Sequence, residues 1–421
     1  MSYYEIQGGR PLEGALTVQG AKNSVLPILA AALLAPGQSV IRNCPNLSDV
    51  SATLDILALL GCRVSREEDC VLIDASSLCR ADIPHRLMGE MRSSVIFLGA
   101  LLARLGAAEL SYPGGCQLGP RPIDLHLSAL RALGGEIREE QGCLYCSGGS
   151  RLRGREICLS LPSVGATENI MLAACGCPGV TTIVGAAREP EIVDLQQFLR
   201  AMGARVSGAG GSVITIRGGK PLHPAEYRVM GDRVAAATWL CAVGAAGGAV
   251  ELTGVEPDHL TAFLACLEGA GCALRTEPGR IILESRGPLK GIPPVRTAPY
   301  PGFPTDAQAI LMAALAGGVG ATMFVENIFD SRYRHVDELR RMGASIQVDG
   351  RVAVVTGAGR LRGAPVRGCD LRGGAALVVA ALGAEGTSRV SGLSHILRGY
   401  DGLERSLRAL GANIREVSRP T

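Results

Sequence analysis

Leu127-Ser-Ala-Leu-Arg-Ala-Leu-Gly-Gly-Glu-Ile137 is a leucine-rich stretch that ends in glycine and continues into alternating polar and apolar residues. Leucines at helical spacing followed by Gly134 are typical of a helix that stops at a left-handed residue. The alternation after the glycine favours a strand. The stretch therefore predicts a helix, a glycine cap and a strand, and it decides the fold because the chain contains this pattern six times.

The six copies occur at a nearly constant spacing. They span residues 57–64, 127–137, 195–206, 260–274, 336–346 and 403–414, and their glycines are Gly61, Gly134, Gly203, Gly271, Gly343 and Gly411. Successive glycines are 73, 69, 68, 72 and 68 residues apart. This period is too long for the common solenoid repeats. A chain of 421 residues is longer than a single hydrophobic core usually accommodates, so we expect two domains with three copies in each.

Each copy also contains a second predicted helix that is apolar nearly all round. These helices span residues 25–34, 94–102, 169–174, 235–243, 307–316 and 374–382. A helix without a polar face must be buried on every side. We therefore predict an α/β fold in which sheets surround central helices, the reverse of a barrel with its helices outside.

Composition is that of a well-packed globular protein. Hydrophobic residues make up 47% of the chain and aromatic residues only 4%, which indicates an aliphatic core. The net charge of +3, without any run of five like charges, argues against nucleic-acid and membrane partners. The sequence contains no secretory pattern and no apolar run long enough to cross a bilayer. We expect a cytoplasmic protein.

Metal and cofactor motifs are missing from the sequence. Cys143 and Cys146 form a C-x-x-C without a second pair at zinc spacing, so we expect the fourteen cysteines to be mostly free thiols. The six histidines form no metal-binding pattern, and neither a P-loop nor a Rossmann glycine motif occurs. We therefore predict no metal and no cofactor.

Charged residues mark the starts of the apolar helices. Six quasi-equivalent positions lie 66 to 74 residues apart: Lys22, Arg92, Gly165, Asp232, Asp306 and Arg372. Simple helix capping explains the two aspartates and the Ser163 that precedes Gly165. It does not explain the three cations, because the helix dipole disfavours a cation at a helix start. Such helix ends favour a ligand rich in phosphate and carboxylate.

The stretch Tyr112-Pro-Gly-Gly-Cys-Gln-Leu-Gly-Pro-Arg-Pro-Ile-Asp124 holds a single cysteine, Cys116, behind two glycines. Glycines let a loop approach a ligand closely, and the prolines on either side of Arg121 restrict its backbone. A reactive thiol beside a ligand-binding arginine and a surface loop with an incidental thiol both fit these residues.

Seven segments together resemble the UDP-N-acetylglucosamine enolpyruvyl transferases, or 1-carboxyvinyltransferases. In order along essentially the whole chain they are Gly20-Ala-Lys-Asn-Ser-Val-Leu-Pro27, Gly114-Gly-Cys-Gln-Leu-Gly-Pro-Arg-Pro-Ile-Asp124, Ser163-Val-Gly-Ala-Thr-Glu-Asn169, Ala187-Arg-Glu-Pro-Glu-Ile-Val193, Pro301-Gly-Phe-Pro-Thr-Asp306, Asp370-Leu-Arg372 and Arg398-Gly-Tyr400. Each segment alone is weak evidence for the resemblance, whereas the order and spacing of all seven are specific to this family.

The resemblance implies a two-domain inside-out α/β barrel with three repeats per domain, in agreement with the period found above. Residues 1–21 and 230–421 would form the first domain, and residues 22–229 the second. The first would carry Asp306, Asp370, Arg372 and Arg398, and the second Lys22, Arg92 and the Cys116 loop.

The implied reaction transfers the enolpyruvyl group of phosphoenolpyruvate to the 3-hydroxyl of UDP-N-acetylglucosamine and releases phosphate, as the first committed step of peptidoglycan precursor synthesis. Addition to the vinyl group needs a general acid and a general base. The resemblance assigns these roles to Cys116 and Asp306, and the Cys116 thiolate could also form covalent adducts, for example with fosfomycin.

The resemblance also implies the binding residues. Phosphoenolpyruvate would be held by Lys22, Arg121 and Arg398, with Asp370 and Arg372 nearby. The nucleotide sugar would contact Asn23, Arg92, Arg121, Pro122, Ile123, Asp124, Leu125, Ser163, Val164, Gly165, Asp306 and Ile328.

Two segments depart from the family pattern. Leu161 stands where some members have a lysine near the UDP phosphates, and Val234-Ala-Ala-Ala237 replaces a segment that usually contains a glutamate and a glycine. Two alternatives remain: enolpyruvylshikimate phosphate synthase, whose family shares the fold class and lacks the Gly-Gly-Cys loop, and a non-catalytic protein that binds UDP-sugar or phosphoenolpyruvate.

Overall fold

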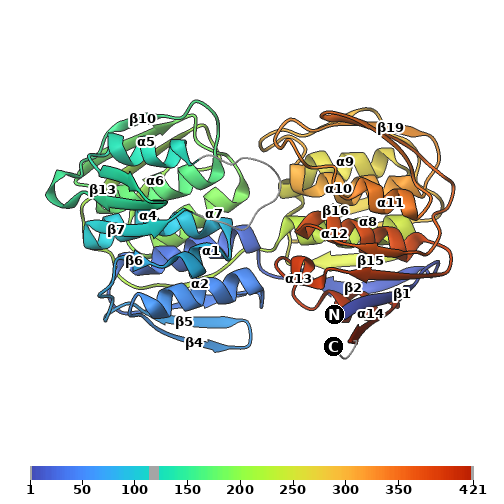
Figure 1. Cartoon of the computed structure of the whole chain (residues 1–421), viewed down its shortest axis with the longest axis horizontal. Helices are drawn as coiled ribbons and strands as arrows, with labels where there is room; N and C mark the ends of the chain where they lie inside the picture. Colours follow the sequence, from blue (N-terminus) through green and yellow to red (C-terminus); the bar gives the residue numbers. More distant parts are fainter. Residues whose placement is uncertain (1, 113–122, 419–421) are drawn as a thin grey trace. The chain divides into compact units, whose positions relative to one another are not determined.

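The computed structural model describes residues 2–112 and 123–418, which form two compact units (Figure 1). Of these residues, 2–19 and 231–418 belong to the first unit, and 20–112 and 123–230 to the second. The boundaries at 19/20 and 230/231 lie within two residues of those that the resemblance implies.

All strands of the described residues belong to six four-stranded sheets, three in each unit. Every sheet has the same pattern: an edge strand pairs in parallel with an inner strand, which is followed by two antiparallel neighbours. The inner faces of these sheets are apolar, so the alternation predicted from the sequence separates core residues from solvent-facing ones.

In spatial order, the sheets of the first unit are β2 (Leu12–Thr17), β15 (Gly248–Thr253), β17 (Arg280–Ser285) and β16 (Ala273–Glu277); β18 (Val295–Arg296), β19 (Ala321–Val325), β21 (Val352–Thr356) and β20 (Ser345–Asp349); and β22 (Pro365–Arg367), β23 (Thr387–Ser391), β1 (Ser2–Gln7) and β24 (Asn413–Ser418). Those of the second unit are β14 (Glu226–Arg228), β3 (Gln38–Arg42), β5 (Cys70–Asp74) and β4 (Arg63–Glu67); β6 (Asp82–Ile83), β7 (Ala107–Ser111), β9 (Cys143–Ser147) and β8 (Glu136–Glu140); and β10 (Glu156–Cys158), β11 (Gly179–Val184), β13 (Val213–Gly218) and β12 (Arg205–Ser207).

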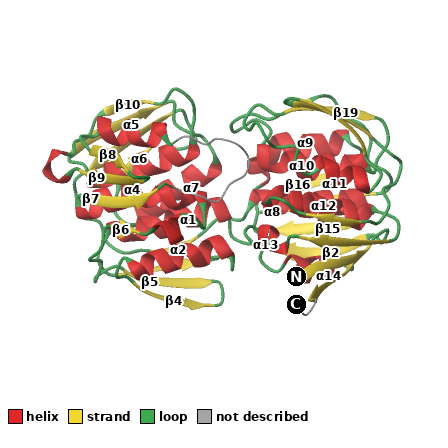
Figure 2. Cartoon of the chain, in the orientation of Figure 1, coloured by secondary structure: helices red, strands yellow, loops and turns green. Residues whose placement is uncertain are grey.

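Buried helices fill the middle of each unit, as predicted, with the sheets outside them (Figure 2). In the first unit they are α8 (Arg233–Ala246), α10 (Thr305–Ala316) and α12 (Leu371–Gly383). In the second they are α1 (Lys22–Ala31) with η1 (Ala32–Leu34), η2 (Arg92–Ile96) with α4 (Phe97–Leu105), and α6 (Val164–Gly176). The sequence predicted α6 only over residues 169–174, because its first two turns contain polar residues that are nevertheless buried.

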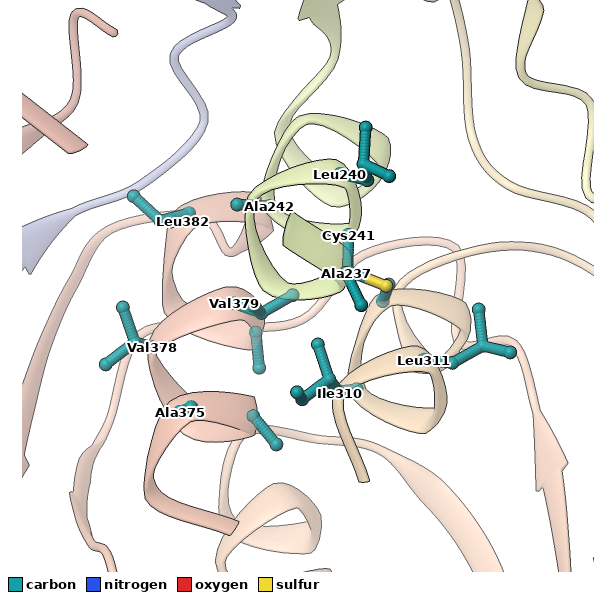
Figure 3. Packing of buried hydrophobic residues seen from close by; sticks show 14 of the residues in the cluster. Ala237, Leu240, Cys241, Ala242, Ile310, Leu311, Ala375, Val378, Val379 and Leu382 are labelled. Atoms are coloured by element: carbon teal, nitrogen blue, oxygen red, sulfur yellow. The ribbon is translucent and has the colours of Figure 1, made fainter. Parts of the chain in front are cut away.

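The three central helices of the first unit pack against one another through small and aliphatic side chains. Figure 3 shows Ala237 of α8, Ile310 of α10 and Val379 of α12 on the sides where these helices meet. All three side chains are fully buried. Burying a side chain such as isoleucine contributes about 1.5–3 kcal/mol, so the shared interior of these helices anchors the unit.

Each repeat also contains an amphipathic helix that ends at one of the predicted glycines. The six glycines have φ angles between +90° and +104°, which confirms the left-handed caps. The helices are α2 (Ser48–Leu59), α5 (Asp124–Ala132), α7 (Pro190–Ala201), α9 (Thr261–Gly269), α11 (Val336–Arg341) and α14 (Leu403–Ala409). The remaining short helices are α3 (His85–Met88), η3 (Gly149–Arg151), η4 (Pro257–Leu260) and α13 (Leu393–Ile396). Across the described residues, every helix is too short or too polar to cross a membrane.

A buried histidine links two of the helices in the second unit. His126 of α5 accepts a hydrogen bond at Nδ1 from Asn169 Nδ2 of α6, over 2.8 Å. The Asn169 amide also donates to Val95 O at 2.9 Å and accepts from Gly99 N at 2.6 Å. Burial, together with the nearby charge of Arg92, lowers the pKa of His126 to about 4. The folded protein therefore keeps this ring neutral at pH 7.

Alanine substitutions at two capping glycines should lower the free energy of unfolding by different amounts. Both Gly134 (φ +104°) and Gly203 (φ +92°) hold a conformation that costs other residues about 1–2 kcal/mol. A Cβ at Gly134 would also lie 2.6 Å from the backbone oxygen of Arg151, whereas one at Gly203 meets only the exposed ring of His223 at 3.1 Å. Gly134→Ala should therefore lower the free energy of unfolding clearly more than Gly203→Ala in urea titrations. Equal losses would contradict this account.

The stability of the second unit should fall as the pH drops from about 6.5 toward 4. In the unfolded chain His126 takes up its proton near pH 6.5, and in the folded chain only near pH 4, so this group costs about 3 kcal/mol by the lower pH. His126→Asn keeps an acceptor for Asn169 and does not titrate. Urea unfolding at pH 7 and pH 4.5 should show a smaller loss for the variant than for the wild-type protein, and an unchanged loss would count against the assignment.

Candidate active site

The second unit places Lys22 at the first position of α1, where no side chain caps the helix. Its Nζ lies 2.7 Å from Oδ2 of Asp49, in the first turn of α2, and both side chains are nearly buried. The carboxylate offsets the unfavourable placement of a cation at a helix start. Asn23, the next predicted residue, is exposed. The pairing with Asp49 was not predicted, because Asp49 lies outside the quasi-equivalent helix starts.

The start of α5 and the start of α6 carry the other predicted residues of the second unit that the structure describes. Ile123 is the buried N-cap residue of α5, and Asp124 and Leu125 form its first turn. Ser163 caps α6 by accepting a hydrogen bond from Ala166 N at 3.3 Å, and Val164 and Gly165 follow it.

His126 brings these two helix starts together. A Cβ at Gly165 would lie 3.0 Å from Cε1 of His126, so only glycine fits without displacing the ring. Arg92, the half-buried first residue of η2, acts electrostatically on the same ring. The structure thus gathers Arg92, the start of α5 and the start of α6 in one part of the unit. Cys116, Arg121 and Pro122 lie outside the described residues, and their roles stay predictions.

The first unit brings most of its predicted residues to the starts of α10 and α12. Asp306, the second residue of α10, accepts at Oδ2 from Nε and Nη2 of Arg372, each over 3.2 Å. Asp370 caps α12 by accepting from the backbone N–H groups of Arg372 and Gly373, at 3.1 and 2.9 Å. Two helix starts found by their spacing in the sequence are therefore joined by an ion pair.

Arg372 is buried, and its position is fixed by a second contact. Its Nη1 donates to the hydroxyl of Tyr400 at 3.2 Å, and that hydroxyl shares a hydrogen bond of 2.8 Å with Thr238 of α8. Burial alone would lower the pKa of Arg372, but the interactions with Tyr400 and Asp306 outweigh it and raise the pKa. The guanidinium thus remains charged in a buried position.

Arg398 lies half-buried two residues before Tyr400. The intervening Gly399 packs so closely on α12 that a Cβ there would meet the side chain of Leu371 at 2.7 Å. The segment that carries Arg398 is therefore held against the start of α12. Ile328, by contrast, lies in the segment after β19, with 38% of its surface exposed.

Arg332 is a site residue that sequence reasoning missed. Its Nη2 donates to Oδ1 of Asp306 at 2.8 Å and to the carbonyl of Thr305 at 3.0 Å, and its side chain is 2% exposed. Asp306 therefore lies between two buried guanidinium groups, one on each carboxylate oxygen. Arg332 follows a strand and belongs to no repeated position, so spacing could not reveal it. The only signal was its occurrence near Ile328.

Among the residues that the structure describes, no three His, Cys, Asp or Glu side chains are arranged to hold a metal ion. The cations and hydrogen-bond donors of the two units are instead suited to bind anionic oxygens. Arg372 and Arg332 can stabilise negative charge that develops close to Asp306, while the carboxylate can accept a proton.

Comparison with known proteins agrees with this chemistry. Residues 6–407 match the family model of EPSP synthase (3-phosphoshikimate 1-carboxyvinyltransferase). The UDP-N-acetylglucosamine 1-carboxyvinyltransferase 2 of Caldanaerobacter subterraneus subsp. tengcongensis is 49% identical, over 98% of this chain and 99% of its own. The UDP-N-acetylglucosamine 1-carboxyvinyltransferase 1 of Symbiobacterium thermophilum is 48% identical, over 98% of this chain and 95% of its own.

Solved structures share the fold over the full length. The enolpyruvyl transferase NikO from Streptomyces tendae superimposes with a TM-score of 0.88 at 27% identity, over 100% of this chain and 99% of its own. An EPSP synthase from Acinetobacter baumannii has a TM-score of 0.78 at 20% identity, over 99% of this chain and 100% of its own, which shows the fold alone. The inside-out α/β architecture is thereby confirmed. The chain belongs to the EPSP synthase family of enolpyruvyl transferases and, within it, to the UDP-N-acetylglucosamine 1-carboxyvinyltransferases.

Proposed function

We propose that this protein transfers the enolpyruvyl group of phosphoenolpyruvate to the 3-hydroxyl of UDP-N-acetylglucosamine and releases phosphate, in the first committed step of peptidoglycan precursor synthesis. The observation that carries the proposal is the 44–49% identity, over 98–99% of this chain, to relatives that bear the name of this activity. The proposal includes a cytoplasmic location, as expected from the sequence.

The first unit would supply the general base. In the addition step, the sugar oxygen forms a bond to C2 of phosphoenolpyruvate, C3 takes up a proton, and the sugar hydroxyl loses one. Asp306 accepts that hydroxyl proton, and the guanidinium groups of Arg332 and Arg372 hold the carboxylate in one orientation. Loss of phosphate from C2 and of a proton from C3 then restores the double bond in the product.

The second unit would supply the general acid and much of the nucleotide-sugar contact. Cys116 gives the proton to C3, and its thiolate form also accounts for the expected covalent adducts. Lys22 and Arg121 hold the phosphate and carboxylate of phosphoenolpyruvate, and so does Arg398, which belongs to the first unit. Asn23, Arg92 and the starts of α5 and α6 contact the nucleotide sugar. The burial of the Lys22–Asp49 pair supports this assignment, because it fixes the cation before substrate arrives.

A phosphate-release assay with two acceptors tests the function. The purified protein and phosphoenolpyruvate are incubated with UDP-N-acetylglucosamine or with shikimate 3-phosphate, and phosphate is measured over time. We expect phosphate release with UDP-N-acetylglucosamine as the acceptor and none with shikimate 3-phosphate. Turnover with shikimate 3-phosphate alone would instead assign the activity that names the matched family model, and binding of the nucleotide sugar without turnover would indicate a non-catalytic protein.

Cys116→Ala should abolish turnover, because the proton donor is lost, while isothermal titration should show nearly unchanged binding of UDP-N-acetylglucosamine. Cys116→Asp should retain part of the activity by supplying another acid, and mass spectrometry should no longer detect the fosfomycin adduct. Cys158→Ala, which removes an exposed thiol of the same unit, is the matched control and should behave as wild type. Near-normal rates of Cys116→Ala would refute the assigned role.

A further inference from the structure

A buried carboxylate with no role in the proposed chemistry lies directly behind the proposed base. Glu326 follows the last residue of β19 and is 1% exposed. Its Oε1 accepts hydrogen bonds from Thr297 Oγ1 at 3.0 Å, Ile328 N at 2.8 Å and Phe329 N at 3.1 Å. Its Oε2 accepts from Thr305 Oγ1 at 3.0 Å. A buried carboxylate is costly unless donors surround it, and these four neutral donors meet that need.

The Oε2 side of Glu326 is connected to the base through the start of α10. Thr305 is the first residue of that helix and immediately precedes Asp306. The carbonyl of Thr305 accepts from Nη2 of Arg332, the same nitrogen that donates to Asp306 Oδ1. The hydroxyl and the carbonyl of Thr305 are therefore both fixed, which leaves the backbone that carries the Asp306 carboxylate little freedom.

The Oε1 side of Glu326 is connected to the segment that follows β19. The bonds to Ile328 N and Phe329 N hold this segment in a tight turn, with the Ile328 side chain partly exposed. The Phe329 ring in turn lies 5.7 Å from the guanidinium of Arg332. Glu326 thus supports Ile328 directly and Arg332 through an aromatic ring.

We propose that Glu326 is a positioning residue for the reaction: one carboxylate oxygen sets the orientation of Asp306 through Thr305, and the other orders the Ile328 turn for the nucleotide sugar. The proposal rests on the function proposed above. It predicts two separable effects, because each oxygen serves a different partner. Loss of the Oε2 contact should reduce kcat, and loss of the Oε1 contacts should raise KM for the sugar.

Three variants separate these effects. In Glu326→Gln the amide oxygen can keep the three donors on the Oε1 side, and its NH₂ group can donate to the Thr305 hydroxyl, so a neutral hydrogen bond of reversed direction replaces the charge-assisted one. Thr305→Val removes this contact altogether. Thr305→Val should lower kcat about tenfold and Glu326→Gln by a smaller factor, both with KM for UDP-N-acetylglucosamine within about twofold of wild type. Glu326→Ala removes both sides and should lower kcat by about 100-fold or more and also raise that KM.

Thr322→Val is the matched control. Thr322 is a buried threonine on β19, the strand that precedes Glu326, and its Oγ1 accepts from Ile292 N at 3.0 Å, outside the site. Thr322→Val should lower Tm without changing kcat per folded molecule. If Thr305→Val changed kcat no more than Thr322→Val does, the positioning role would be overturned.

Hydrogen exchange provides a readout that does not depend on turnover. The amides of Ile328 and Phe329 should exchange faster in Glu326→Ala and at the wild-type rate in Glu326→Gln. Unchanged exchange of these two amides in Glu326→Ala would show that Glu326 does not order this turn. This conclusion would hold even if the wild-type enzyme used an acceptor substrate other than UDP-N-acetylglucosamine. Lack of wild-type turnover with UDP-N-acetylglucosamine would instead defeat the proposed function, and the kcat and KM ratios would then be measured with the acceptor that is used.

Discussion

The packing of central helices that are apolar on every side is the constraint on which the rest of the structure depends. Along α8, α10 and α12 nearly every residue is buried and most are apolar, so most of the polar side chains lie where these helices begin. In the first unit, hydrogen bonds connect the first turns of α10 and α12 to the second turn of α8: they run from Asp306 through Arg372 and Tyr400 to Thr238. The chemistry is concentrated there because the core admits no polar side chain along most of its length.

Charge at these helix starts is balanced locally. Asp306 faces two guanidinium groups, and Lys22 faces Asp49, so each of these ions has a partner of opposite sign. Two buried histidines are instead neutral, because burial lowers the pKa of both His126 and His335 to about 4. A neutral ring adds no second positive charge beside the nearby arginine, which is Arg92 for His126 and Arg332 for His335.

The periodicity of the sequence predicted the parts of the structure that repeat. It located the six left-handed glycines, the central helices and the helix starts that carry Asp306 and Arg372, because each repeat needs the same cap and the same buried face. It could not find Arg332, Asp49 or Glu326. These side chains act through contacts specific to one repeat, at positions with no counterpart to compare. It also predicted too short a helix at α6, because Thr167 and Asn169 are polar residues that are buried only where neighbouring groups satisfy their hydrogen bonds.

The position of β1 has a consequence for the order in which the chain can assemble. This strand is the first of the described residues, yet it lies between β23 and β24 and pairs with the last described strand. The second unit is complete once residue 230 has been synthesised, whereas β1 of the first unit has no partner strand until β23 and β24 have been synthesised. Loss of β24 alone would expose an edge of β1, and an open edge invites pairing with other chains. An intact β24 therefore protects β1 from aggregation.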